Sequence, residues 1–392
     1  MPSDQSTWLI AVPQDGESEG LLQEITSKLG LSSKVAARSI SQLNLPTFKT
    51  GTLDSLIGLS EDLPKQDTYF TAVVAKTVDT LRNLLNNDPN KLSQHILVNE
   101  NSVDDYLLNN WTWNSGRYGV QRGLQEMAEV LSKEMTSIDN MMKTKLNNYN
   151  LAKGSLVQMQ RKKTGNLSVR SLADIVSRDD FLLDSEYMET LLVAVPSNLA
   201  KEWNTKYERL ASMVVPRSSR LIASDSEYSL FGVVIFKKVR DEFIQKSREN
   251  KYIVRDFVYS EDALDKQRDD LDMADTTEKE LWTELLRLSR TNFSESFQLL
   301  VHLKVVRLFV ESVLRYGLPA NYTGLVIKPE PKSTTKTLTV LTKQFTYLAP
   351  RSSRGAQAPK GGGNDDFVGE YQNLMEQEFF DFVLYEVPWI VN

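Results

Sequence analysis

The stretch GVQRGLQEMAEVLSKEMTSIDNMMKTKLNNYNLAKGSLVQMQRKK (residues 119–163) contains no proline, and its apolar residues recur at steps of three, four and seven. This stripe consists of Val120, Leu124, Met127, Leu131, Met135, Ile138, Met142, Tyr149, Leu156 and Met159. Such spacing places side chains on one face of an α-helix that packs along a partner, as in a coiled coil. At 1.5 Å per residue the helix spans about 65 Å, more than a compact domain needs.

A second long helix is predicted from Glu261 to Tyr316, with no proline or glycine before Gly317. Its first half, EDALDKQRDDLDMADTTEKELW (261–282), is strongly charged and typical of a solvated face. Its second half has an apolar stripe that we expect to be buried, formed by Leu299, Leu303, Val306, Val310 and Val313. The sequence YGLP (316–319) then provides a glycine and a proline, which commonly end a helix.

Three short runs that are rich in apolar residues and end in proline predict β-strands. They are WLIAVP (8–13), LLVAVP (191–196) and VLYEVP (383–388). Between the two long helices, strand-like and helix-like stretches alternate over about a hundred residues. That length is enough for one small α/β domain.

Two long helices that flank one small domain pair most simply as antiparallel partners. We therefore predict a mixed α+β fold shaped as an elongated dumbbell, with a head, a two-helix neck and a foot built from both chain ends. The foot would hold WLIAV (8–12) and FFDFVLYEV (379–387) in one shared sheet. The predicted domains are a foot of residues 1–118 and 318–392, a neck of 119–163 and 262–317 whose inner ends pack into the foot, and a head of 164–261. The Pro/Gly/Ser-rich segment 350–364 predicts a mobile loop.

The composition argues against several classes of protein. A net charge of −6 disfavours a dedicated nucleic-acid binder, which usually has a basic surface. The chain has no cysteine, which excludes disulfides, Cys-ligated zinc, iron–sulfur clusters and thiol catalysis, and which fits the reducing cytosol. The start MPSDQSTWLIAVP (1–13) has no pattern of a secretory signal, and no apolar run reaches the roughly 18 residues of a membrane span. We expect a cytoplasmic protein that reaches a membrane only through partners.

The stretch QRKKTGNLSVRSLADIV (160–176) raises the question of a phosphate-binding loop. It lacks the order G-x-x-x-x-G-K-[ST] of a P-loop and follows a helix instead of a strand. We interpret it as a junction, in which cations meet the negative end of the helix dipole, Gly165 adopts the left-handed conformation and Ser171–Asp174 open a short helix. Contact with a partner or a phosphate is the alternative. The candidate partner-binding residues are Arg161, Lys162, Lys163 and Arg170, whose charge density suits an acidic surface.

The other candidates for chemistry favour structural roles. His302 lies beside the apolar stripe and is expected to be a hydrogen-bonded core histidine, and His95, in SQHILVNE (93–100), is expected at the edge of a strand. Neither belongs to a metal or catalytic motif. Adjacent carboxylates suit solvated or helix-capping roles, and they occur at Asp104–Asp105, Asp179–Asp180, Asp269–Asp270 and Asp365–Asp366. We expect no catalytic, cofactor-binding or metal site.

Several of these phrases together resemble one family, the C subunit of the vacuolar-type proton ATPase (V-ATPase). They are RKKTGNLSVRSLADIV (161–176), LLVAVP (191–196), FKTGTLDSLIGLSEDL (48–63) and FVESVLRYGLP (309–319). The resemblance covers nearly the whole chain in the same order. It implies a head, a neck of long helices and a foot that contains both chain ends.

The resemblance also implies a role as a non-catalytic peripheral-stalk component that bridges the ATP-hydrolysing sector and the membrane-embedded proton channel, and whose release accompanies separation of the sectors. The implied partners are one heterodimer of the E and G subunits at the head, and a second such heterodimer plus the cytosolic N-terminal part of subunit a at the foot. The sequence leaves actin contact open. The competing interpretations are a coiled-coil scaffold or trafficking adaptor, and an enzyme housed in the head.

Overall fold

The computed structural model describes residues 2–3, 5–13, 18–33, 36–172, 174–183, 185–259, 261–348 and 380–389. The chain divides into two compact units, which we call unit 1 (1–145 and 284–392) and unit 2 (146–283). Each unit contains one four-stranded antiparallel sheet together with helices. The predicted mixed α+β class is therefore confirmed. The predicted loop 350–364 and the pair Asp365–Asp366 lie outside the described residues.

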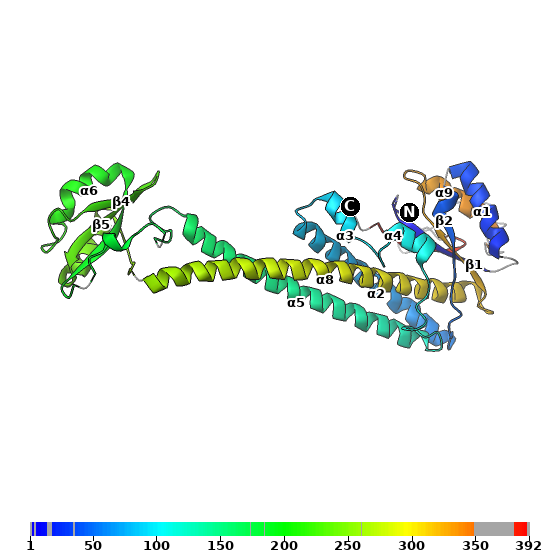
Figure 1. Ribbon diagram of the computed structural model, residues 1–392. Helices are drawn as coiled ribbons and strands as arrows, with labels where there is room; N and C mark the ends of the chain where they lie inside the picture. Colours follow the sequence, from blue (N-terminus) through cyan, green and yellow to red (C-terminus); the bar gives the residue numbers. More distant parts are fainter. Residues whose placement is uncertain are drawn as a thin grey trace, which may run out of the picture. The chain divides into compact units, whose positions relative to one another are not determined.

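The sheet of unit 1 joins strands from both ends of the chain in the order β2-β7-β1-β8. Figure 1 labels β1 and β2 of this sheet beside α1 and α9. These strands are β1 (Thr7–Pro13), β2 (Ile40–Leu43), β7 (Tyr322–Ile327) and β8 (Val383–Val387). Strand β1 pairs antiparallel with β8, with Trp8 opposite Glu386, which confirms the expected shared sheet. Both faces of β1 are buried, because α1 (Ser18–Ser33) and α9 (Thr334–Gln344) cover one face and long helices cover the other.

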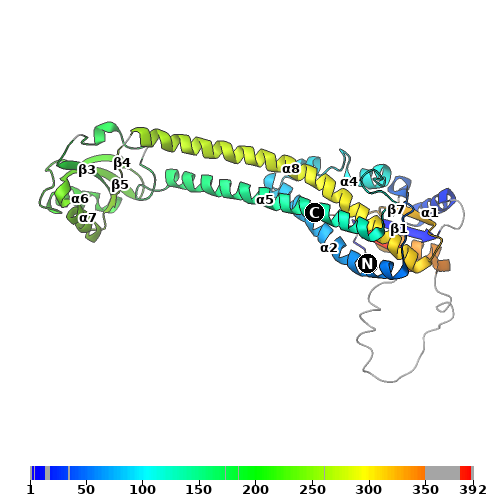
Figure 2. The ribbon, with the colours of Figure 1, turned by 90° about the horizontal axis from the view of Figure 1, so that it is seen from below.

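Three helices form the second layer of unit 1: α2 (Leu53–Leu84) and the parts of α5 (Leu124–Thr164) and α8 (Glu261–Tyr316) that belong to this unit (Figure 2). The buried stripe predicted for α8 is confirmed, since Leu299, Leu303, Val306, Val310 and Val313 are all buried. Eight of the ten residues of the predicted stripe are buried, all on α5; Met159 is half-buried, and Val120, also half-buried, lies before α5, which begins at Leu124 and not at 119. Lys145 pairs with Glu284 and Met142 contacts Ser289, so within unit 1 the two helices run antiparallel.

The sequence analysis made no prediction for helix α2, which contains Pro64 in its interior. Proline removes one backbone donor and usually breaks a helix. Here the helix persists because Leu56, Leu63, Phe70, Val74, Val78 and Leu81 bury one continuous face in the core. Its N-terminus is capped by the Thr52 hydroxyl, which accepts the Ser55 N–H at 3.3 Å.

The expectation for His95 was wrong, since this residue ends a helix and does not lie at a strand edge. Helix α3 (Pro89–His95) begins at Asp88, whose carboxylate accepts the N–H groups of Asn90 and Lys91. The His95 Nδ1 lies 2.9 Å from the Lys91 carbonyl oxygen. A capping Asp followed by Pro is a helix start that outweighs the apolar ILV run behind it. The short helix α4 (Val103–Asp105) continues into a π-helical turn, Tyr106–Asn110.

Unit 2 contains a sheet in the order β4-β5-β3-β6, all pairs antiparallel. Its strands are β3 (Met188–Pro196), β4 (Arg220–Ser224), β5 (Tyr228–Phe236) and β6 (Ile253–Arg255). Helices α6 (Ala200–Lys206) and α7 (Arg240–Glu249) cover one face through the buried rings of Trp203 and Phe243. The other face packs on Leu167, Leu172 and Val176 of the segment that follows α5.

Candidate interaction sites

The junction after α5 is built around a close approach of two backbone segments. The Gly165 N–H donates to the Arg161 carbonyl at 3.0 Å. The predicted left-handed conformation of Gly165 is wrong, because the described glycines with positive φ are Gly51 and Gly317. Glycine is needed at position 165 for space instead: a Cβ there would lie 3.3 Å from the Arg161 carbonyl oxygen and 3.5 Å from the Arg170 nitrogen.

The prediction of a helix that starts at Ser171 is also wrong, since the described residues that follow it form turns. A capping box occurs later, at Ser177 and Asp180.

Two charged residues of unit 2 hold this junction: Asp225, in the turn between β4 and β5, and Arg255, in β6. Asp225 accepts the Leu167 N–H at 2.7 Å, and Arg255 donates to the carbonyls of Leu167 and Arg170, both at 2.8 Å. Burial opposes ionisation of Asp225, but the N–H groups of Leu167, Tyr228 and Glu227 outweigh it and lower the pKa of this carboxyl. The stretch 165–170 is therefore a structured connection that is clamped to the sheet by ionic side chains.

The structure separates the four candidate partner-binding residues by exposure. Arg161 is exposed on the last turns of α5, whereas Arg170 is half-buried and its charge helps to lower the pKa of Asp225. Lys162 and Lys163 belong to α5, but their side chains lie outside the described part of the chain. The backbones of Arg161 and Arg170 come together at Gly165, so α5 and the junction bring these two positions close.

A buried ionic cluster in unit 1 escaped the sequence analysis. The Lys304 Nζ lies 2.7 Å from one Asp67 carboxylate oxygen, and the Arg307 Nη1 lies 2.7 Å from the other. The Arg307 guanidinium also lies over the Tyr385 ring, 4.3 Å from its centroid. Burial lowers the pKa of Lys304 despite the nearby carboxylate. The cluster connects α2, α8 and β8. In the sequence, the only sign of it was that Lys304 and Arg307 interrupt the apolar stripe of the second long helix.

The RYGLP phrase anchors the last strand. The Arg315 Nη1 donates to the Phe380 carbonyl at 2.8 Å, and the Tyr316 hydroxyl accepts the Val383 N–H at 3.0 Å. That hydroxyl donates to the Ala11 carbonyl at 3.2 Å. Gly317 then has a φ of +81°, which confirms the predicted stop. The motif therefore serves the sheet that joins the two chain ends.

His302 is a core residue, as predicted. It is 2% exposed and surrounded by the rings of Trp111, Trp113 and Tyr118. Its Nδ1 lies 2.7 Å from the Gln298 carbonyl, and its Nε2 accepts the Asn114 N–H at 3.2 Å. Burial lowers the pKa of His302 to about 4, so the ring is neutral at pH 7.

Within the described residues, no three His, Asp or Glu side chains gather in a way that would hold a metal ion. The same part of the chain contains no helix both long and apolar enough to cross a membrane.

Taken together, the fold defines a mixed α+β protein of two compact units that share two long helices. The sequence matches the family described as the C subunit of V-ATPase over residues 7–383. Among its relatives are two C subunits of the V-type proton ATPase, form 1-B of Danio rerio and form 1 of Rattus norvegicus. Each is 37% identical to this chain over 97% of both chains. The chain belongs to the V-ATPase C-subunit family.

A likeness to a solved structure adds nothing to this assignment. That structure is the cytoplasmic N-terminal domain of subunit I, a homologue of subunit a, of V-ATPase. It is 14% identical and covers 86% of this chain and 97% of its own, but the TM-score of 0.29 is too low to indicate a common fold.

Proposed function

We propose that this protein is a non-catalytic peripheral-stalk subunit, a stator, of the vacuolar-type proton ATPase. It would bridge the ATP-hydrolysing sector and the membrane sector, and its binding and release would support regulated assembly. Membership of the C-subunit family along 97% of the chain carries this proposal. A stator must hold two bodies against torque, and a chain with two compact units and two long helices suits that task.

In this role the chain would act as a dumbbell with three parts. The foot comprises residues 1–118 and 318–392, the antiparallel two-helix neck comprises 119–163 and 262–317, and the head comprises 164–261. The ionic cluster of Asp67, Lys304 and Arg307 would stiffen the foot end of the neck, because it fixes α8 to α2 and β8.

The partners follow from the same proposal. The head would bind one elongated heterodimer of the E and G subunits, and the foot would bind a second such heterodimer together with the cytosolic N-terminal domain of subunit a. Two moderate contacts on one body bind with an avidity that neither has alone. Loss of one contact would release the whole protein, which suits reversible disassembly. The protein would then be cytoplasmic, attached to the cytosolic face of vacuolar and other endomembranes only through these partners.

At the head, Arg161, Lys162, Lys163 and Arg170 would help to engage an acidic partner surface. The exposure of Arg161 and the run of three consecutive cations at the end of α5 support this role. Arg170 has a second task beside Asp225, so its contribution to binding must be separated from its effect on the junction.

The proposed function is tested by affinity capture of the tagged protein from its own cells, with mass spectrometry of every co-purifying chain. We expect the E, G and a subunits, and we expect their recovery to fall when the two sectors separate. Recovery of none of them from cells whose pump is demonstrably assembled would refute the stator role and leave a scaffold or trafficking adaptor.

A further inference from the structure

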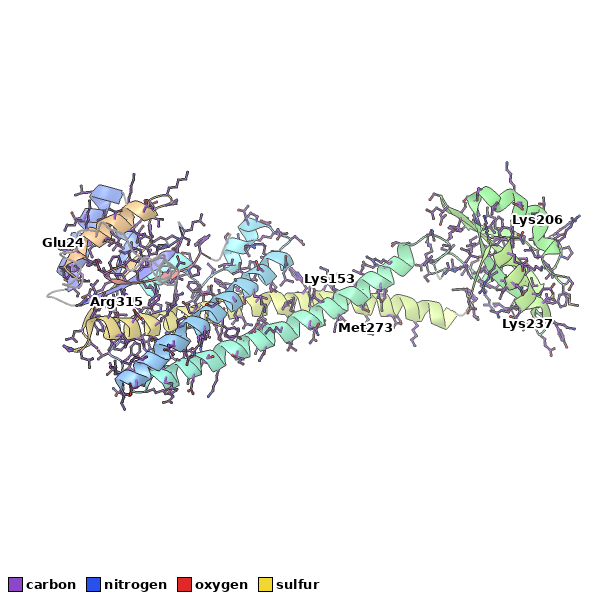
Figure 3. The ribbon with its side chains drawn as sticks, turned by 180° about the vertical axis from the view of Figure 1, so that it is seen from behind. Glu24, Lys153, Lys206, Lys237, Met273 and Arg315 are labelled. Carbon is purple, nitrogen blue, oxygen red and sulfur yellow. The ribbon has the colours of Figure 1, made fainter. Side chains whose placement is uncertain are left out.

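Helix α5 ends in a threonine that directly follows three cations, in the sequence RKKT (161–164). Thr164 is exposed, and so is Arg161, three positions before it. Figure 3 labels Lys153 on the same helix, which continues past it to its end at Thr164. Protein kinases that select basic substrates bind an arginine at this spacing through carboxylates of their substrate groove, and they phosphorylate the hydroxyl that follows it.

The chain around this threonine can leave the helix at little cost. A kinase binds its substrate as an extended chain, so the residues next to the hydroxyl must unwind. No described side chain from 157 to 166 is buried, whereas Leu156 before this stretch and Leu167 after it are. Helix ends fray, and a threonine followed by a glycine favours the helix only weakly. Unwinding the last turns of α5 therefore breaks helical hydrogen bonds without opening a hydrophobic core.

The fold closes the two other places where a serine follows an arginine at the same spacing. These are Ser41, after Arg38, and Ser212, after Arg209. Ser41 lies in β2 and its hydroxyl oxygen is buried. Ser212 is exposed, but the two residues before it are buried in the core of unit 2. Of the three positions, Thr164 alone combines exposure with a described flank that buries no side chain.

A phosphate on Thr164 would act against the end of the helix. The Thr164 hydroxyl donates to the Gln160 carbonyl at 3.0 Å, and a phosphate ester has no proton on that oxygen to donate. The added group carries about two negative charges and lies at the negative end of the α5 dipole. Glu227, which accepts the Asn166 amide at 2.7 Å two residues further along, adds a like charge. A pair between the phosphate and Arg161 would be exposed to water and would offset only part of these effects.

We propose that Thr164 is a phosphorylation site for a protein kinase that selects basic substrates, and that the phosphate unwinds the last turns of α5. In the reaction the Thr164 oxygen forms a bond to the γ-phosphorus of ATP while the bond from that phosphorus to the β-phosphate oxygen breaks. ADP leaves, and the hydroxyl proton passes to a carboxylate of the kinase.

The unwound turns lead into the connection 165–170, which Asp225 and Arg255 hold to the sheet. Phosphorylation would loosen the helix side of the junction and leave this clamp in place. The site goes beyond the proposed function, because neither its recognition nor its effect involves another subunit of the pump.

The first test treats the purified full-length protein with ATP and the catalytic domain of protein kinase C, which selects basic substrates, and locates phosphate by mass spectrometry of peptides. We expect phosphate at Thr164, and a rate about tenfold lower in Arg161→Gln because one charge-assisted contact with the kinase is lost. The matched control is Arg209→Gln, which removes the corresponding cation before Ser212 and should leave the rate at Thr164 unchanged. If the protein is not labelled at Thr164, the proposal falls, whether or not a peptide of residues 157–170 is labelled.

The second test measures the effect of the phosphate by hydrogen–deuterium exchange. Amides of residues 157–166 should exchange about tenfold faster in the phosphorylated protein, whereas those of β3 should not change. Thr164→Val lacks the hydroxyl but adds no charge, so it should speed exchange less than the phosphate does. Equal exchange with and without phosphate overturns the proposal. So does the absence of phosphate at Thr164 in protein isolated from its own cells with phosphatases inhibited. Either result leaves the stator role intact.

Discussion

At the scale of single residues, Asp67 is the shared acceptor for two cations in the core of unit 1. Its side chain is 10% exposed, and those of Lys304 and Arg307 are 5% and 23% exposed. Asp67→Ala would leave two charges without their carboxylate, which typically destabilises a protein by about 3–5 kcal/mol. Urea denaturation should show this loss. The control is Asp62→Ala in the same helix, an exposed partner of Lys65 that should cost less than about 1 kcal/mol. Equal losses in the two variants would contradict a structural role for the cluster.

A second prediction at this scale concerns pH. The pKa of His302 is about 4 in the folded protein, against about 6.5 for an unperturbed histidine. The unfolded state therefore binds more protons between these values. The stability that comes from the neutral ring is fully present above pH 6.5 and is lost as the pH falls to 4, by up to about 3 kcal/mol. The groups that face the ring are Arg117 and Glu134, and their charges act more weakly than burial does.

Urea denaturation of the wild type and of His302→Gln at pH 7 and pH 4.5 measures this component. The difference in unfolding free energy between the two proteins should shrink at pH 4.5. His95→Gln is the control, because that ring lies at an exposed end of α3. If the stability of His302→Gln changed with pH as steeply as that of the wild type, the buried ring would not be the source.

At the scale of elements, replacing glycine by alanine should have opposite effects on stability at two positions, Gly324 and Gly58. A Cβ at Gly324 of β7 would lie 2.4 Å from the Leu43 carbonyl oxygen, so Gly324→Ala forces β2 away and should destabilise unit 1 by about 1–3 kcal/mol. At Gly58 of α2, nothing lies within 4 Å of a Cβ. Gly58→Ala should therefore stabilise the protein by about 0.5–1 kcal/mol through helix propensity. Thermal unfolding of both variants tests the pair, and a loss at Gly58 equal to that at Gly324 would sink the explanation.

The same scale shows what the sequence can and cannot predict. The buried stripes of α5 and α8 were predictable because apolar residues repeat along one face of each helix. The pairing of β1 with β8 was predictable because both are apolar strands near the ends of the chain. Helix α2 was not predicted. Its Pro64 is a local signal against a helix, and the buried face that outweighs this signal is a tertiary effect. Gly165 was misread for a related reason: the close backbone contact that requires a glycine joins residues 161 and 170 and leaves no local pattern.

The candidate sites were less predictable than the fold. Arg161 to Lys163 stand out as a charge run, but the role of Arg170 beside Asp225 depends on a contact made 55 residues further along the chain. Likewise, the cluster of Asp67 with Lys304 and Arg307 joins α2 and α8, which lie far apart in the sequence, and periodicity does not encode that contact. Sequence patterns thus indicate which residues are unusual, and the packing decides what they contact.

At the scale of the whole molecule, the charge run at the end of α5 gives a prediction about partner binding. The triple variant Arg161→Glu, Lys162→Glu and Lys163→Glu should weaken binding of the E–G heterodimer and reduce its dependence on salt, because exposed charge pairs are screened. Arg170 is left unchanged to preserve the junction with Asp225. A matched control reverses three basic residues in or just after α7, Lys246, Arg248 and Lys251. Binding titrations of the E–G heterodimer at two ionic strengths test this prediction. Equal affinities and equal salt dependence for the triple variant and the wild type would show that these residues do not belong to the interface.

The last prediction concerns retention in the assembled pump. Two contacts on one chain raise each other's effective concentration, so weakening one contact lowers the overall affinity by the same factor even though the other is untouched. A variant of unit 2 that weakens binding of the E–G heterodimer tenfold in solution should therefore shift this protein from the membrane fraction to the soluble fraction, with no change in unit 1. Sedimentation of membranes followed by quantitative immunoblotting measures the shift, with the reversal of Lys246, Arg248 and Lys251 as the control. If the weakened variant stayed on the membranes as completely as the control, the unit 1 contact alone would hold the protein, and release would have to act there.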